Sequence, residues 1–315
     1  MAVVRLDITQ RSPFAHGTLF GRVGPYELVQ GTASFAVDPL HPRNAVITDL
    51  DLAPRDATGR VALSAPFTIL RPLHPERGNR RLFFDVVNRG RKTVLQRFNR
   101  APAVADHTAA LEPGNGFLMR HGYTVVWCGW QADVPPAPGL MGLRAPEALG
   151  PDGPLSGKML CQFQANETTP MFLLADRQHL PHAAADSNEP NATLTVRDHP
   201  NGAAESISRE QWSFVSLEGD PAPYYIQLHT GFEPGKIYQL VYTSRGSTIV
   251  GLGFAAVRDI VSFLKYATVD DGNPCAGTLD YAYAFGSSQS GRFLRQMIHL
   301  GLIEDEDERL ALDGI

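Results

Sequence analysis

Residues 281–300 read YAYAFGSSQSGRFLRQMIHL, and this stretch sets the expectation for the whole chain. Aromatic residues occupy alternate positions over 281–285, which is typical of a buried strand. After the small residues at 286–291, apolar residues recur at helical spacing, with Phe293 four residues before Met297. The pattern predicts a strand, a tight turn and a helix, which is the context that holds a serine nucleophile at the edge of a sheet.

Two serines of this turn compete for the role of nucleophile. Such a turn needs small residues two before the nucleophile and two and three after it, because strand and helix close tightly there. Ser288 has Gly286 before it and Ser290 and Gly291 after it, whereas Ser290 would have the bulky Arg292 two residues on. We therefore predict Ser288 as the nucleophile. The match to the motif G-x-S-x-G is imperfect, because Ser290 stands where the motif has its second glycine. The alternative interpretation is an ordinary Ser/Gly-rich turn between a strand and a helix.

Backbone N–H groups near Ser288 are expected to stabilise a developing oxyanion. The first would belong to Gln289, at the start of the helix. The second would follow the apolar strand at 123–127, where we assign it to Trp130; a half-buried aromatic lid is the alternative for that residue. Arg292 is expected to orient the serine or to bind a substrate carboxylate, with a solvated helix surface as the alternative. Gln131 is a second predicted substrate contact.

Composition limits the classes of protein that remain. The chain has 315 residues, of which 43% are hydrophobic, and its net charge is −5. This suits one large α/β domain with additions, or two domains, and no basic cluster suggests nucleic acid or an anionic membrane. The three cysteines form neither a disulfide framework nor a metal motif. No signal-like segment or membrane-spanning apolar run is present, so a cytoplasmic protein is expected.

The chain is expected to fall into four regions. Residues 1–75 contain short strands and turns and predict a β-rich N-terminal region. Residues 76–134 and 235–315 have alternating strand and helix patterns and predict two parts of one core. Residues 135–234, rich in Pro and Gly, predict a β-rich insertion between them.

Three other patterns could carry chemistry, and each has an ordinary explanation. The basic loop at 88–91 is interpreted as a solvated turn, with a substrate-side loop as the alternative. The glycines at 251–256 match G-x-G-x-x-A, but residues 244–250 separate them from the preceding strand, so we favour close helix packing over nucleotide binding. The histidines of the insertion lack a helical spacing or a carboxylate cluster, and we predict no metal and no cofactor; these are His179, His182 and His199.

Five segments resemble, in order, a bacterial α/β-hydrolase-domain family of poorly defined substrate. They are GTASFAVDP, FFDVVNRGRK, GYTVVWCGWQADV, GLGFAAVRDIVSFLKY and FGSSQSGRFLRQ. The resemblance extends over nearly all of the chain except the variable insertion. It implies an α/β fold: an α/β-hydrolase core with a mostly parallel sheet and β-rich additions. It also implies Ser288 as the nucleophile and hydrolysis of a small-molecule ester without a cofactor.

The chain departs from that family where the rest of a catalytic triad should lie. In α/β hydrolases the acid and the histidine follow the serine. Here only His299 and the acidic run at 304–308 follow it. His299 lies about three helical turns away, roughly 16 Å along the axis, so it cannot serve as the base. The acidic run is interpreted as a solvated loop or helix end.

The last residues, 311–315, have the pattern of a further core strand. We therefore expect the C-terminal strands, the acid and the base to lie beyond the given chain, leaving a serine-dependent carboxylic ester hydrolase that is catalytically incomplete. Upstream, His121 should lie at the wrong sheet edge, and His229 is interpreted as a surface histidine. The alternative is a non-catalytic, hydrolase-like binding or scaffold protein. An exposed apolar sheet edge beside the strand at 281 would favour self-association.

Overall fold

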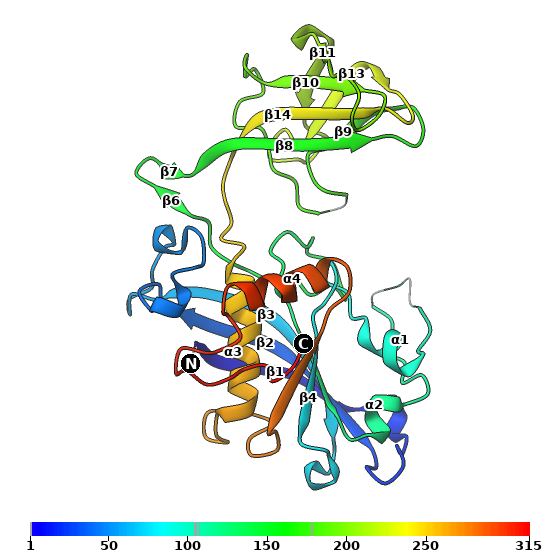
Figure 1. Cartoon of the computed structure of the whole chain (residues 1–315), viewed down its shortest axis with the longest axis vertical. Coiled ribbons are helices and arrows are strands. Elements are labelled where there is room, and N and C mark those ends of the chain that lie inside the picture. Colours follow the sequence, from blue (N-terminus) through cyan, green and yellow to red (C-terminus); the bar gives the residue numbers. More distant parts are fainter. Residues whose placement is uncertain (1, 104–105, 107, 178) are drawn as a thin grey trace. The chain divides into compact units, whose positions relative to one another are not determined.

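The chain divides into two compact units, which are coloured along the sequence in Figure 1. The computed structural model describes residues 2–103, 106, 108–177 and 179–315. Unit 1 comprises Met1–Pro146 and Thr248–Ile315, and unit 2 comprises Glu147–Ser247. The inserted unit therefore begins and ends later in the chain than the 135–234 expected from composition.

Unit 1 is built on a six-stranded sheet with the order β1-β2-β3-β5-β4-β15. Strands β1, β2 and β3 form an antiparallel meander, and β5 pairs antiparallel with β3. Strands β5, β4 and β15 are mutually parallel, so their carboxyl ends meet at one edge. The bounds are β1 Val3–Pro13, β2 Tyr26–Val37, β3 Val61–Pro72, β4 Arg81–Asp85, β5 Thr124–Cys128 and β15 Tyr281–Phe285.

The predicted fold class is wrong. The structure is 35% strand and 17% helix, and its sheets are antiparallel or mixed, unlike the helix-rich α/β-hydrolase core that we expected. The physical reason lies in the connections. A parallel sheet needs long crossovers, usually helical, between its strands, yet the longest strands here pair antiparallel within β1–β3. The four α-helices of the described residues are α1 Val94–Asn99, α2 Phe117–Arg120, α3 Leu252–Tyr266 and α4 Gln289–His299.

Helix α3 is buried along almost its whole length and packs against strands of the sheet. At Gly253 an added Cβ would fall 2.2 Å from the carbonyl oxygen of Trp130, so only glycine permits this approach. Residues 246–251 separate α3 from the preceding strand β14, Ile237–Arg245. The glycines of the G-x-G-x-x-A pattern thus lie at a packing contact.

Residues after α4 return to the sheet beside β15. The Asp313 N–H donates to the Ala282 carbonyl at 2.8 Å, and the Ala284 N–H donates to the Gly314 carbonyl at 2.9 Å. Lys265 of α3 anchors this segment, with its Nζ 2.7 Å from a carboxylate oxygen of Asp313. The edge that we expected to be open is therefore paired along part of its length, and self-association stays a prediction.

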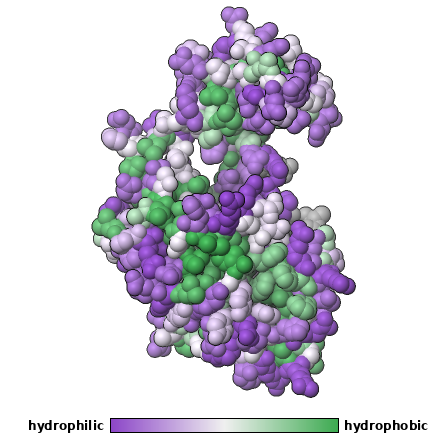
Figure 2. Space-filling view, viewed as in Figure 1, coloured by the Kyte–Doolittle hydropathy of each residue, from purple (hydrophilic) through white to green (hydrophobic). Residues whose placement is uncertain are grey.

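Unit 2 contains two antiparallel sheets and a short hairpin. The sheets have the orders β11-β10-β14-β8 and β12-β13-β9, and the hairpin joins β6 to β7. The core combines aliphatic residues with large aromatic side chains, including Trp212, Phe232 and Tyr242. Hydrophilic residues cover most of its visible surface in Figure 2, whereas hydrophobic residues gather on part of the visible face of unit 1. The remaining strands are β6 Leu149–Gly150, β7 Gly153–Pro154, β8 Ser156–Gln164, β9 Thr169–Leu173, β10 Thr193–Arg197, β11 Glu205–Ile207, β12 Trp212–Val215 and β13 Tyr225–Phe232.

The chain enters and leaves unit 2 along paired backbone segments. On the unit 2 side, the Ala148 N–H donates to the Ser247 carbonyl at 2.8 Å. On the unit 1 side, the Ile249 N–H donates to the Pro146 carbonyl at 3.0 Å. Short 3-10 helices occur at Phe14–Gly17, Pro42–Asn44, Leu50–Leu52, Pro75–Arg77 and Arg209–Gln211.

Candidate active site

Ser288 occupies the turn between β15 and α4, where it is the N-cap residue of the helix. Its backbone has φ 56° and ψ −112°, a conformation that residues with a Cβ rarely adopt. Such strain costs on the order of 1–3 kcal/mol and persists only where the surrounding structure enforces it. The side chain is exposed. The turn therefore presents a serine hydroxyl to solvent at the positive end of a helix.

Small residues around Ser288 enforce this turn. An added Cβ at Gly286 would fall 2.4 Å from the carbonyl oxygen of Ser290, so strand and helix can close only over glycine. The buried Ser290 hydroxyl donates to the Ser287 carbonyl at 3.0 Å and accepts from the Ser287 N–H at 3.1 Å. The two candidate serines therefore differ: Ser290 braces the turn, and Ser288 has the accessible hydroxyl.

The first turn of α4 offers N–H groups beside this hydroxyl. The Arg292 N–H donates to the Ser288 carbonyl at 3.0 Å and begins the helical bonding. The preceding N–H groups, including that of Gln289, have no partner within an α-helix and can meet a ligand. The Gln289 Oε1 atom is buried and lacks a hydrogen-bond partner among the described residues.

Trp130 reaches α4 through its ring. The ring packs against Phe293 with centroids 4.3 Å apart, and the indole N–H donates to the Val87 carbonyl at 2.7 Å. This matches the half-buried aromatic alternative for the side chain. Gln131 is buried, and its backbone carbonyl accepts from Leu143 at 2.9 Å. Arg292 is exposed in the first turn of α4.

The loop after β4 lies directly beside the serine turn, although the sequence favoured a solvated turn there. The Asn88 side chain donates to the Ser287 carbonyl at 2.9 Å, and the Val86 N–H donates to the Phe285 carbonyl at 3.0 Å. The two loops are neighbours because β4 pairs parallel with β15, and loops after adjacent parallel strands share one edge. The sequence carries no signal for that pairing.

Asp85 fixes this loop at the end of β4 and was not singled out from sequence. One carboxylate oxygen accepts from the N–H groups of Thr93 and Val94 at 2.6 and 2.8 Å and from the Trp127 indole at 2.6 Å. The other accepts from the Thr93 hydroxyl at 3.0 Å. Burial raises the pKa of Asp85, and these four donors oppose the shift. Burial also lowers the pKa of nearby Lys92, against the attraction of the Asp85 charge.

Among the histidines that the structure describes, none forms a hydrogen bond with the Ser288 side chain. His299 is the last residue of α4, at the opposite helix end. His121 precedes β5 and so lies toward the amino ends of the parallel strands, whereas Ser288 follows a carboxyl end. His229 is exposed on β13 of unit 2. Within the described residues, the Ser288 hydroxyl takes part in no hydrogen bond with another side chain.

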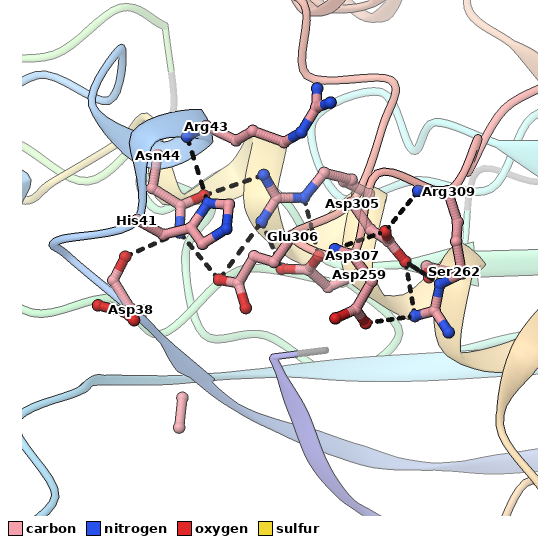
Figure 3. A network of polar contacts seen from close by, with 12 residues as sticks. Asp38, His41, Arg43, Asn44, Asp259, Ser262, Asp305, Glu306, Asp307 and Arg309 are labelled. Carbon is pink, nitrogen blue, oxygen red and sulfur yellow. Dashed lines mark hydrogen bonds and ion pairs between the residues drawn. The ribbon is translucent and has the colours of Figure 1, made fainter.

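A second polar cluster lies in unit 1, and its members Asn44, Asp259 and Asp305 are labelled in Figure 3. It also includes Arg258, whose side chain is fully buried. Arg258 donates to both carboxylate oxygens of Asp259 at 2.8 and 3.0 Å and to the Asn44 side chain at 2.9 Å. Nearby, Asp305 accepts from Ser262 and from Arg309. The interpretation of 304–308 as a solvated segment is wrong at Asp305, which is fully buried. These charges compensate one another, so the cluster is a structural anchor for α3.

Two further features bear on function. In the described ranges, no group of three or more His, Cys, Asp or Glu side chains is placed to hold a metal ion. Among the helices of these same residues, none combines the length and the apolar character that crossing a bilayer requires.

Comparison of the chain with protein-family models, with curated proteins and with solved structures found no match. The resemblance drawn from short sequence segments therefore stays a hypothesis, and the function rests on the geometry of the serine turn.

Proposed function

We propose that the protein is a serine-dependent hydrolase of carboxylic esters, with Ser288 as the nucleophile. The observation that carries the proposal is the strained conformation of an exposed serine at a strand-to-helix turn, with φ 56° and ψ −112°. Strain of this kind concentrates at functional sites, where it aims a side chain that relaxed backbone would turn away. The fold class is not part of the proposal.

In the proposed reaction, the Ser288 oxygen attacks the ester carbonyl and forms a tetrahedral intermediate. The Gln289 N–H, at the positive end of α4, would stabilise the negative oxygen. The ester C–O bond then breaks, and the alcohol leaves with the proton that the Ser288 hydroxyl has lost. Water hydrolyses the acyl-serine to a carboxylic acid and restores the hydroxyl. The proposal assigns no general base, and it requires no metal or cofactor.

Two loops compete for the second oxyanion donor. The sequence pointed to the backbone N–H of Trp130, after β5. The loop after β4 is also adjacent, and it is bonded to the serine turn through the Asn88 side chain and the Ser287 carbonyl. That hydrogen bond favours a donor from the loop after β4. The contact between Trp130 and α4 is made by its ring and not by its backbone N–H.

A second function is a non-catalytic binding or scaffold protein. It is favoured by one observation: in the described part of the chain, no side chain forms a hydrogen bond with the Ser288 hydroxyl. A nucleophilic serine ordinarily has a base within hydrogen-bonding reach, although this contact is often looser without substrate. The hydrolase proposal includes the small-molecule ester substrate and the cytoplasmic location that were expected from the sequence. The binding-protein alternative includes neither.

The deciding experiment is fluorophosphonate labelling together with turnover of p-nitrophenyl butyrate. Since no described side chain is hydrogen-bonded to the Ser288 hydroxyl, we expect labelling and turnover to be slow in the wild-type chain, lost in Ser288→Ala and retained in Ser287→Ala. Ser287→Ala is a matched control because it removes a neighbouring hydroxyl while leaving the backbone bonds of the turn. Absence of labelling in a folded wild-type chain would instead support the binding protein, as would labelling that persists in Ser288→Ala.

A further inference from the structure

Arg89 lies at the tip of a tight hairpin beside the serine turn. Asn88 and Arg91 exchange two backbone hydrogen bonds, at 2.9 and 3.0 Å, and leave Arg89 and Gly90 as the two central residues. Both have left-handed backbones, with φ 49° and 78°. Glycine and asparagine are the usual residues of such turns, and an arginine there costs roughly 1 kcal/mol. The local fold alone does not explain an arginine at this position.

The Arg89 guanidinium is coupled to the serine turn but is only partly satisfied. Its Nη1 atom donates to the Asn88 side-chain oxygen at 3.1 Å, and the same amide donates to the Ser287 carbonyl at 2.9 Å. Its Nε atom is buried and has no hydrogen-bond partner among the described residues. A buried donor without an acceptor is unfavourable, and a planar anion would satisfy it together with a neighbouring guanidinium N–H.

Other positive charge lies around Ser288. Arg292 is in the first turn of α4, and the helix N-terminus adds its own partial charge. Among the ion pairs of the described residues, none involves Arg89, Arg91 or Arg292. The acid closest in sequence to the hairpin, Asp85, is buried and already accepts from four donors. Asp85 therefore does not neutralise the positive charge of these three arginines.

We propose that Arg89 and Arg292 form a subsite for a carboxylate on the substrate, so that the preferred esters are anionic. This inference rests on the proposed function, because it names the substrate class of the same site. The substrate carboxylate would accept from the Arg89 guanidinium, and Arg292, in the first turn of α4, would add electrostatic attraction. Arginine suits this role because its fork of donors matches the two oxygens of a carboxylate.

The test measures binding and turnover separately on the full chain. Calorimetry compares 4-acetamidobenzoate with 4-acetamidobenzamide, which have the same shape and differ in charge. Turnover compares the corresponding esters, 4-acetoxybenzoate and 4-acetoxybenzamide. We expect the benzoate to bind about 10- to 100-fold more tightly, the range for hydrogen bonds to a charged group. The preference should fall about tenfold or more in Arg89→Gln and also decrease in Arg292→Gln.

Arg295→Gln is the matched control, since it removes the same charge from an exposed position of α4. Its preference for benzoate should equal that of the wild type. Equal or undetectable binding of both compounds, or a preference unchanged in both subsite variants, would overturn the carboxylate subsite. A preference for benzoate without turnover of either ester supports the subsite and removes the hydrolase proposal. Turnover of both esters without a charge preference supports the hydrolase proposal and removes the carboxylate subsite.

Discussion

Replacing Asp85 tests whether the loop beside the serine turn is held by a buried carboxylate. In Asp85→Ala, the Val94 N–H and the Trp127 indole N–H lose their acceptor, and both residues are fully buried. Each unsatisfied buried donor costs about 1–3 kcal/mol, so the free energy of unfolding should fall by about 2–6 kcal/mol. That is a large part of the 5–15 kcal/mol that is typical of a folded domain.

Asp85→Asn is the informative partner of this variant. The amide oxygen can accept from the three N–H donors, and the amide nitrogen can donate to the Thr93 hydroxyl, so all four contacts persist. The neutral amide also avoids the burial cost that raises the pKa of Asp85. We expect a loss below about 1 kcal/mol for this variant.

The assay is urea unfolding followed by circular dichroism and tryptophan fluorescence, with the slope compared among variants. Fluorophosphonate labelling of Ser288 reports on the loop itself, because Asn88 links that loop to Ser287. Asp85→Ala should label more slowly than Asp85→Asn. If the two variants lose equal stability, or if alanine is the milder change, the carboxylate does not organise this loop and the reasoning is refuted.

Three further predictions concern the turn and unit 2. Ser288→Gly should raise the free energy of unfolding by about 1 kcal/mol, because glycine relieves the backbone strain, while labelling is lost; a lower thermal midpoint would contradict this. Gly286→Ala should cost at least about 1–3 kcal/mol in urea unfolding, since its Cβ would fall 2.4 Å from the Ser290 carbonyl oxygen. Gly157→Ala is the matched control, because this glycine also lacks a left-handed backbone and nothing lies within 4 Å of its added Cβ. Burial raises the pKa of Glu189, but hydrogen bonds from Lys158 and Thr243 outweigh this effect and lower the pKa from its usual 4.5 to about 2. The stability that Glu189 adds is therefore present above pH 4.5 and is lost as the pH falls toward 2. Acid unfolding of Glu189→Gln should lack this component, and an unchanged acid profile would refute it.

Local patterns predicted individual elements well. The strand, turn and helix expected over 281–300 are β15 and α4, and the helix packing favoured for the glycines at 251–256 is found at α3. These elements depend on periodicity and on small residues at a turn, which neighbouring residues determine. The β-rich N-terminal region is likewise present as β1, β2 and β3.

Features that depend on distant residues were not predicted. Periodicity identifies a strand but does not give the direction of its partner, and the antiparallel pairing of β3 with β5 joins residues more than fifty positions apart. Asp85 and Asp305 are isolated acids in sequence, and their burial depends on donors brought from other segments. The neighbour of Ser287 was missed for the same reason, because Asn88 is 199 residues away along the chain.

The paired backbone at the entry and exit of unit 2 means that this unit can be deleted or exchanged as one continuous segment. Because the Ile249 N–H meets the Pro146 carbonyl, the two ends of unit 1 are already adjacent where the insertion begins and returns. A short turn could join them, so deletion of Glu147–Ser247 would remove one contiguous stretch of coding sequence without crossing the six-stranded sheet. The same junction can accept a foreign domain whose termini lie close together, which makes unit 1 a host for domain exchange.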